Sequence, residues 1–255
     1  MSSKGATTCI RVISLAGADE RRRTFAERAA ATSLEWSFFD ACEEKHASLC
    51  YDADQVLERL GRGLTKGEIG CFSSHYALWE EFENAPEAQL LVLEDDVLVD
   101  WAFVSQLCQM DISAHGVEYL RLFYKNPTKS ILKQRGFVDR QHNLIELFGF
   151  AWGTQAYIMT KEGAQSFRSA CAEIEMPIDD QMDRSWRHGI PNLAIFPPVV
   201  LEESVASSIG SERFKDSHQR EAMAAFRARE FSLSKRSYLS ARLKHAIKRR
   251  LPGGG

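Results

Sequence analysis

The sequence lacks the local signatures of the common nucleotide and hydrolase sites. It contains no GxxxxGK[ST] phosphate loop, no GxGxxG fingerprint, no GxSxG nucleophile elbow and no HExxH helix. Its six cysteines form no CxxC pair and its seven histidines are dispersed, which argues against a zinc site. Any catalytic centre must therefore be built from other groups, and carboxylates are the obvious candidates.

Long apolar runs are also missing. No segment approaches the roughly 20 apolar residues that a spanning helix needs, and residues 1–8 are too polar for a signal peptide. We therefore expect a cytoplasmic protein with reduced thiols. The 44% hydrophobic and 26% charged content is typical of a globular chain, and 255 residues suffice for a substantial core.

Acidic residues are missing from the end of the chain. Seven of the 32 basic residues and none of the 35 acidic residues lie after position 230, which leaves residues 1–230 with a net charge of about −10. A body of that charge is a poor partner for phosphate backbones, so we expect no nucleic-acid partner. We predict one domain over residues 1–230 and a separate basic tail over 231–255.

The basic tail has an amphipathic pattern. Leu239, Leu243, Ile247 and Leu251 recur every four residues among lysines and arginines. Such a helix can lie on an anionic membrane surface, which would make the protein peripheral on the cytoplasmic face of the inner membrane. The alternative is a terminal helix that packs its leucines on the domain.

Strand and helix patterns alternate along the body. Strand-like apolar runs occur at 9–15, 36–39, 89–93, 119–124, 156–159 and 193–196. Helices are expected from Asp19 as an N-cap, over 53–60 with Gly61 as the stop, after Thr160, and from Pro177 with Met182 and Trp186 on its inner face. The alternation predicts an α/β fold around a mixed, mostly parallel sheet flanked by helices.

The clearest helix signal is LTKGEIGC at 64–71. Thr65 and Glu68 fit a capping box, and Leu64 and Ile69 occupy the hydrophobic-staple positions. The helical spacing of the following large residues predicts one buried face and an end before Pro86. That face comprises Ile69, Phe72, Tyr76 and Trp79.

Three adjacent acids follow a buried strand. The run at 90–93 delivers Glu94, Asp95 and Asp96 to the carboxyl end of a strand, where open α/β sheets bind ligands. Three neighbouring carboxylates repel one another, so a cation is their natural partner. Oxygen ligands suit Mg²⁺ or Mn²⁺, which take further ligands from substrate phosphates. The alternative, a solvated acidic turn, is made less favourable by the apolar residues on both sides.

These segments together resemble glycosyltransferase family 25. The resemblance rests on VISL at 12–15 with ERR at 20–22, FFDA at 38–41, LTKGEIGC at 64–71 with SH at 74–75 and LW at 78–79, LEDD at 93–96, and then GT at 153–154, AY at 156–157 and PID at 177–179. It spans roughly residues 9–210. Family members often carry Asn and basic residues where this chain has Ser14, Ala16 and Gly17.

The resemblance implies a GT-A-like nucleotide-binding fold, a UDP-sugar donor, a divalent metal (Mn²⁺ or Mg²⁺) and inversion at the anomeric carbon. Galactose is the commonest donor sugar in such proteins. The acceptor would be a lipopolysaccharide, a lipooligosaccharide or a related lipid-linked glycan. Asp96 and Glu94 would hold the metal as the family's form of the DxD signature, with Asp95 and Glu94 near the ribose or sugar.

The remaining roles are hypotheses for single residues. Asp179 is our candidate general base and Asp180 its alternate, because both lie at a predicted helix start where a carboxylate is stabilised. His75 is either a core histidine or a brace beneath the donor. Further contacts with the sugar donor are expected from Ser14, Leu15, Arg21, Arg22, Asp40, Gly153 and Thr154. Asp40 could accept a hydrogen bond from uracil or simply cap the end of a strand.

Two other functions remain open. A metal-dependent phosphoryl or nucleotidyl transferase could use the same acidic triplet, and a non-catalytic nucleotide-sugar-binding module could retain it without a base. We expect loops such as 125–138, which carry no recognisable motif, to select the acceptor.

Overall fold

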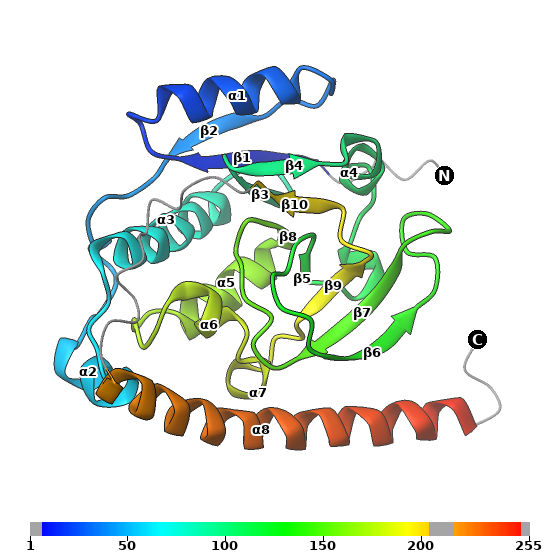
Figure 1. Cartoon of the computed structure of the whole chain (residues 1–255). Coiled ribbons are helices and arrows are strands. Elements are labelled where there is room, and N and C mark those ends of the chain that lie inside the picture. The colour runs from blue at the N-terminus through cyan, green and yellow to red at the C-terminus, as the bar shows by residue number, and fades with distance from the viewer. Residues whose placement is uncertain (1–6, 204–216, 251–255) are drawn as a thin grey trace.

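The computed structural model describes residues 7–203 and 217–250. Within them, one mixed sheet has eight strands in the order β2-β1-β3-β8-β5-β9-β7-β6, and β4 and β10 form a separate pair (Figure 1). The pairings place six strands of the large sheet in one direction and only β7 and β8 in the other. The strands are β1 (Thr8–Ser14), β2 (Ser37–Asp40), β3 (Gln89–Glu94), β4 (Val97–Val99), β5 (Tyr119–Arg121), β6 (Lys129–Gln134), β7 (Asn143–Phe148), β8 (Ala156–Thr160), β9 (Leu193–Phe196) and β10 (Val200–Glu202).

Helices cover both faces of the sheet and so create two apolar layers. Phe25 of α1 and Phe103 of α4 pack in one layer, and Trp79 of α3 and Phe167 of α5 pack in the other. The helices are α1 (Asp19–Ala29), α2 (Ala53–Leu60), α3 (Lys66–Glu83), α4 (Trp101–Cys108), α5 (Lys161–Ala170), α6 (Ile178–Met182), α7 (Ser185–His188) and α8 (Ser217–Arg250). This arrangement confirms the predicted α/β fold with a mixed, mostly parallel sheet.

Local sequence signals explain where α3 begins. Thr65 and Glu68 form the predicted capping box, and the Glu68 carboxylate also makes a buried, bidentate pair with Arg62 at 2.7 and 2.8 Å. Gly70 is required because a Cβ there would lie 2.5 Å from the carbonyl oxygen of Cys42. The glycine therefore lets α3 pack closely against the segment that follows β2.

Several sequence predictions about elements need correction. Asp19 is the first residue of α1, and the N-cap residue, Ala18, makes no side-chain capping bond. The helix predicted from Pro177 ends at Met182, so Trp186 belongs to the separate helix α7. The strand predicted at 119–124 is only three residues long. The β6–β7 hairpin and the β4–β10 pair were not predicted. Strand β6 is mostly exposed and polar, and β4 and β10 are three-residue strands that pair across about a hundred positions.

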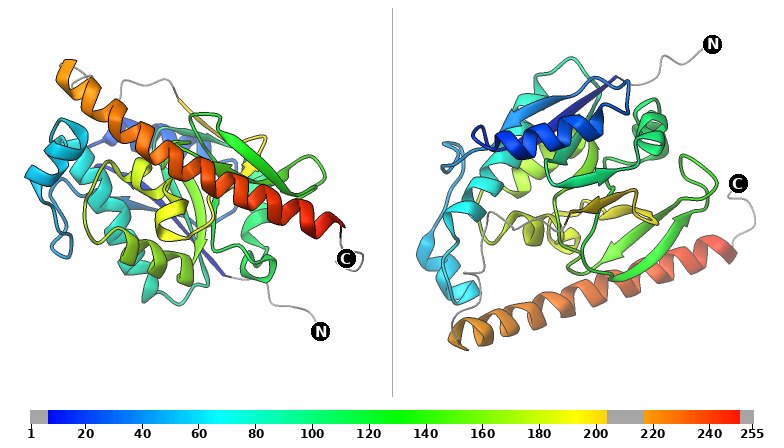
Figure 2. Two further views of the ribbon diagram at one scale, coloured as in Figure 1. Left: turned by 90° about the horizontal axis from the view of Figure 1, so that it is seen from below. Right: turned by 45° about the horizontal axis from the view of Figure 1, so that its top comes forward.

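The last helix is longer than the predicted tail. Helix α8 is continuous across positions 230 and 231 and runs past α2, α7 and β7 (Figures 1 and 2). Its first half is anchored by the buried Glu230, which accepts hydrogen bonds from Trp186 Nε1 at 2.6 Å and Arg187 Nη2 at 2.7 Å. The division of the chain into residues 1–230 and 231–255 stays a prediction.

The second half of α8 keeps its apolar residues exposed. Leu239, Leu243 and Ile247 are 53%, 63% and 50% exposed, which contradicts the alternative in which these side chains pack on the domain; Leu251 lies outside the described residues. Within the part of the chain that the structure describes, no helix has the length and apolar character needed to cross a membrane.

Candidate active site

The three acids lie where the sequence predicted, at the carboxyl end of β3. Leu90 to Leu93 are fully buried between the two apolar layers, so the strand holds the turn rigidly. The backbone of Glu94 donates to the carbonyl of Gln155, and the backbone of Glu203 donates to the carbonyl of Asp96, both at 2.8 Å. The loop before β8 and the end of β10 therefore flank the acidic turn.

Glu94 points toward α3. Its Oε1 accepts a hydrogen bond from Thr154 Oγ1 at 2.7 Å and lies 3.7 Å from His75 Nε2. Burial raises the pKa of Glu94, but the nearby imidazole of His75 and the Thr154 hydroxyl outweigh it and leave the pKa below its ordinary value. Glu94 is thus held as a carboxylate by His75 and Thr154.

His75 is fully buried beneath Glu94. Its Nδ1 lies 2.9 Å from the hydroxyl of Tyr157, which also accepts a hydrogen bond from Trp79 Nε1 at 2.8 Å. Tyr157 of β8, itself held by Trp79 of α3, therefore fixes the imidazole ring. Its full burial fits a core histidine, and its place 3.7 Å from Glu94 also fits a brace beneath the donor site, so both alternatives stay predictions.

Asp95 is buried and turned toward the N-terminal segment. Its Oδ2 accepts a hydrogen bond from Ser14 Oγ at 2.6 Å, and its Oδ1 is paired with Arg21. Arg21 Nη2 also contacts Asp96 Oδ2 at 2.9 Å. The structure therefore brings Ser14 and Arg21 to the acidic turn, where Arg21 supplies positive charge; their contact with a donor stays a prediction.

Asp96 has an unsatisfied oxygen. Its Oδ1 is buried and has no hydrogen-bond partner among the described residues. Burial, and then the charge of Glu94, raise the pKa of Asp96 to about 6. A buried carboxylate oxygen that is short of positive charge fits a divalent cation with oxygen ligands. Asp96 and Glu94 would hold this ion, which is the predicted assignment.

A second group of side chains could supply ligands to a metal ion, and it shares Glu94 with the acidic turn. Ligand atoms of Cys71, His75 and Glu94 lie within 4.8 Å of one another, and His75 Nε2 has no hydrogen-bond partner among the described residues. This group lies on the α3 side of Glu94, away from the Asp96 oxygen. Its thiol and imidazole suit a softer metal than the carboxylates of Glu94 and Asp96 do.

The other predicted residues of the N-terminal segment lie beside the turn. Arg22 donates to the carbonyl of Ser14 at 2.9 Å and to Asp40 Oδ1 at 2.5 Å, and its guanidinium lies 4.8 Å from the Phe38 ring centroid. Asp40 is exposed and could exchange this partner for a ligand. Leu15 follows β1 and is exposed as well.

A second acidic group lies across the 152–154 segment. Asp179 Oδ2 is 3.5 Å from the backbone nitrogen of Gly153, and Asp180 Oδ1 accepts from Trp152 Nε1 at 3.0 Å. Since Thr154 binds Glu94, one short segment connects both acidic groups. Gly153 has φ of +89°, and a Cβ there would lie 2.6 Å from the Phe123 ring, so only glycine fits.

The two aspartates of α6 differ in burial. Asp179 is half-buried, whereas Asp180 is buried. Burial, and then the charge of Asp179, raise the pKa of Asp180 to about 7. The more accessible Asp179 can reach a substrate, and Asp180 responds to its charge.

Sequence reasoning missed Asp183 and Arg121. They form a fully buried ion pair at 2.8 Å, and Asp183 Oδ2 also accepts from the backbone of Trp152 at 2.7 Å. Arg121 donates to the carbonyl of Gly153. The pair therefore fixes the segment between the acidic groups. Only the charged residue inside the apolar run YLRLF at 119–123 could have revealed it.

Glu202, the last residue of β10, lies near the acidic turn. It pairs with Val97 across β10 and β4 and accepts from Gln155 Nε2 at 3.3 Å. Its charge is among those that raise the pKa of Asp96. It is a further carboxylate on the rim of the turn.

Replacing Arg121 with methionine is expected to lower the free energy of unfolding by about 3–5 kcal/mol near pH 8, because Asp183 is left buried and uncompensated. Burial already raises the pKa of Asp183 to about 6 despite Arg121, so protonation should reduce the loss near pH 5. Urea denaturation at both pH values measures it. The double variant Arg121→Met/Asp183→Asn should be less destabilised at pH 8; an equal loss would contradict the charge argument.

Residues 8–182 match the profile of glycosyltransferase family 25 (LPS biosynthesis protein). The chain belongs to this family. The matched region contains the acidic turn, His75, the 152–154 segment and both α6 aspartates. The predicted resemblance is therefore confirmed, and the GT-A-like placement of an acidic motif at the end of an inner strand agrees with it.

Curated relatives belong to family 25 as well. The chain is 32% identical over 123 residues to the probable inactive glycosyltransferase 25 family member 3 of Bos taurus and 28% identical over 123 residues to procollagen galactosyltransferase 1 of Danio rerio. Each match covers 47% of this chain and 20% of the relative. The chain thus spans about a fifth of the length of these relatives, and the family includes proteins named as inactive.

Among solved structures, a glycosyltransferase involved in the glycosylation of the major capsid of PBCV-1 is similar, with a TM-score of 0.42 and 10% identity. The similarity covers 86% of this chain and 98% of that chain. A likeness at this level adds nothing to the family assignment.

Proposed function

We propose that this family 25 glycosyltransferase transfers a hexose, with galactose as the first candidate, from a UDP-sugar to a lipopolysaccharide, a lipooligosaccharide or a related glycan, with inversion. The observation that carries the proposal is the buried Asp96 oxygen at the carboxyl end of β3, which has no hydrogen-bond partner in the part of the chain that the structure describes. Procollagen galactosyltransferases among the relatives support galactose as the donor sugar.

The proposed donor site is formed by the acidic turn and the N-terminal segment. Asp96 and Glu94 would hold a Mn²⁺ or Mg²⁺ ion, which would supply positive charge to the diphosphate leaving group. Arg21 lies against the turn and has a buried Nε without a hydrogen-bond partner among the described residues. It can turn toward a phosphate oxygen, while Asp40 and Arg22 lie where a nucleoside would meet the end of β2.

The proposed acceptor chemistry lies on the α6 side. Asp179 takes the proton from the acceptor hydroxyl as its oxygen attacks the anomeric carbon, and the bond from that carbon to the diphosphate breaks to release UDP. The Arg121–Asp183 pair holds the backbone of Gly153 against Asp179. Positioning of Asp179 therefore depends on the segment that also holds Glu94 through Thr154.

The rate of transfer should rise with pH through about 7. The pKa of Asp180 is raised from 3.8 to about 7, so Asp180 stays protonated in the folded protein below about pH 7. Asp179 and Asp180 therefore carry their full negative charge only above this pH. Because Asp180 releases its proton at lower pH in the unfolded chain than in the folded protein, the free energy of unfolding should also fall as pH rises from about 4 to 7. Profiles of kcat/KM between about pH 5 and 9 measure the inflection. Asp180→Asn should move it downward; an unchanged inflection would contradict this coupling.

The function is tested by incubating the protein with a panel of UDP-sugars, with Mn²⁺ or EDTA, and following release of UDP. We expect turnover of UDP-galactose that needs the metal. A phosphoryl or nucleotidyl transferase would leave the glycosidic bond of UDP-galactose intact. Binding of UDP-sugars without any release of UDP would identify the non-catalytic alternative, which the relatives named as inactive keep open.

We further propose that the protein is cytoplasmic and that the second half of α8 rests on the anionic inner membrane, where a lipid-linked acceptor would be found. The exposed Leu239, Leu243 and Ile247, together with neighbouring basic residues, support this. Leu243→Glu should weaken cosedimentation with anionic vesicles, whereas Leu57→Glu, an exposed leucine on α2, should not. Equal binding by both variants would contradict the proposal.

A further inference from the structure

An aromatic cavity of about 560 Å³ lies between α8 and the loop that joins β7 to β8. Its aromatic walls are Phe148 at the end of β7, Phe150 and Trp152 from the loop that follows, and Phe231 from α8. Asn126 lies in the segment before β6, and Lys129 is the first residue of β6. Its volume falls in the range of small-ligand sites, which are mostly apolar with a few polar groups. The cavity is bounded by residues 126–129, which belong to the loop 125–138 that we expect to select the acceptor.

The cavity shares a wall with the proposed base. Trp152 lines the cavity and donates through Nε1 to Asp180 at 3.0 Å. The next residue, Gly153, lies against Asp179. Arg227 of α8 also lines the cavity, and its guanidinium lies 5.3 Å from the Trp152 ring centroid. A ligand in this cavity would therefore lie one side chain away from the carboxylates of α6.

The walls suit a sugar ring. One face of a pyranose presents C–H groups with partial positive charge, which pack well on the negative faces of aromatic rings. Phe231 is 57% exposed, so a large apolar surface remains open to such a ligand. Hydroxyl groups of the sugar could meet Thr128 and Ser234, which also line the cavity. Acidic side chains are absent from the residues that line it.

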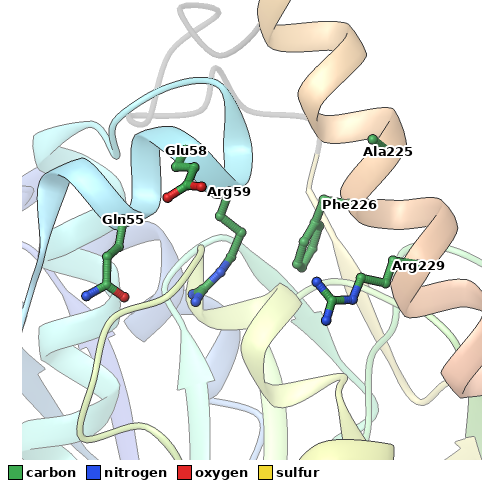
Figure 3. Close-up of a pocket in the computed structure, with 6 residues that line it drawn as sticks. All are labelled: Gln55, Glu58, Arg59, Ala225, Phe226 and Arg229. Atoms are coloured by element: carbon green, nitrogen blue, oxygen red, sulfur yellow. The ribbon is translucent and has the colours of Figure 1, made fainter.

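A second cavity, of about 460 Å³ between α2 and α8, is the weaker candidate (Figure 3). Arg59 and Arg229 extend toward the same space there, with Phe226 between them. Arg59 already pairs with Glu175 at 3.4 Å, and none of the six lining residues belongs to the candidate active site. It offers neither several aromatic walls nor a connection to the α6 aspartates.

We propose that the aromatic cavity binds a pyranose ring of the acceptor and so directs the acceptor hydroxyl toward Asp179, an inference that rests on the proposed transferase function. Helix α8 is then part of the acceptor site as well as a brace for α7. The segment 152–154 joins the two substrates, because it contacts the cavity, Asp179 and Glu94.

The test uses the full chain and three methyl β-pyranosides, those of glucose, galactose and glucuronic acid, observed by saturation-transfer difference NMR. We expect saturation transfer to at least one glycoside. Phe231→Ala should reduce it about fivefold, because one stacking wall is lost. The matched control is Leu239→Ala, an equally exposed residue of the same helix outside the cavity, which should leave the signal unchanged.

Two results would overturn the proposal: no saturation transfer from the wild-type protein to any of the glycosides, or equal signals from Phe231→Ala and the wild type. The thermal shift caused by UDP and Mn²⁺ is measured on the same samples and should be the same in all three proteins. Absence of that shift alone would remove the proposed donor chemistry, while the glycoside signals would still decide whether the cavity binds sugar.

Discussion

The variant Asp96→Asn is expected to lower the rate of sugar transfer by about 10²–10³-fold. The amide preserves the shape of the side chain but removes the negative charge at a buried carboxylate oxygen that has no partner within residues 7–203 and 217–250. Initial rates as a function of Mn²⁺ concentration measure the effect, and the variant should also need more metal to reach half of its residual rate.

The matched control for Asp96 is Glu203→Gln. Glu203 follows the flanking strand β10 and pairs with Arg28 Nη2 at 2.7 Å, outside the acidic turn. Its loss should change the rate little. Equal rates and equal metal dependence in the wild type and in Asp96→Asn would remove Asp96 from the donor site.

Asp179→Asn is expected to lower kcat by about 10²–10⁴-fold, which is the usual contribution of a positioned general base. Donor binding should not change, because Asp179 contacts Gly153 and not the acidic turn. Single-turnover transfer rates and UDP affinity, measured on the same preparation, separate the two effects.

Asp180→Asn provides the comparison on the same helix. Asp180 is more buried than Asp179 and already accepts a hydrogen bond from Trp152. Its substitution should therefore lower kcat less and should mainly change the pH dependence of the rate. If Asp179→Asn retained most of the transfer rate while Asp180→Asn lost it, the roles of the two aspartates would be reversed.

The elements that the sequence predicted well are those with local causes. The capping box of Thr65 and Glu68 places the start of α3 from four consecutive residues. The apolar run of β3 is easy to recognise in the sequence because both faces of this strand are buried. Since the three acids follow the run directly, their place at the end of the strand could be predicted as well. Asp52 and Gly61 fix the two ends of α2 in the same local way.

The elements that escaped prediction depend on contacts between distant parts of the chain. Arg121 and Asp183 are 62 positions apart, and no local pattern indicates that they pair. Glu202 approaches Asp96 only because β10 pairs with β4 across about a hundred residues. The β6–β7 hairpin has one largely solvent-facing strand, so its hydrophobic pattern is weak.

The predicted site residues fall into two neighbouring groups. At the acidic turn of Glu94, Asp95 and Asp96, hydrogen bonds and ion pairs hold Ser14 and Arg21. The α6 aspartates form the second group. Gly153 and Thr154, which were predicted as donor contacts, lie in the segment between the two groups. Their joint placement supports one site with donor and acceptor sides.

The central claim is that the acidic turn binds a nucleotide diphosphate through a divalent ion. Calorimetric titration of the protein with UDP, in Mn²⁺ and again in EDTA, tests it most directly. We expect binding at least about tenfold tighter with the metal, equivalent to about 1.4 kcal/mol, and loss of that gain in Asp96→Asn. Equal affinity in Mn²⁺ and EDTA, or no binding in either, would contradict the account.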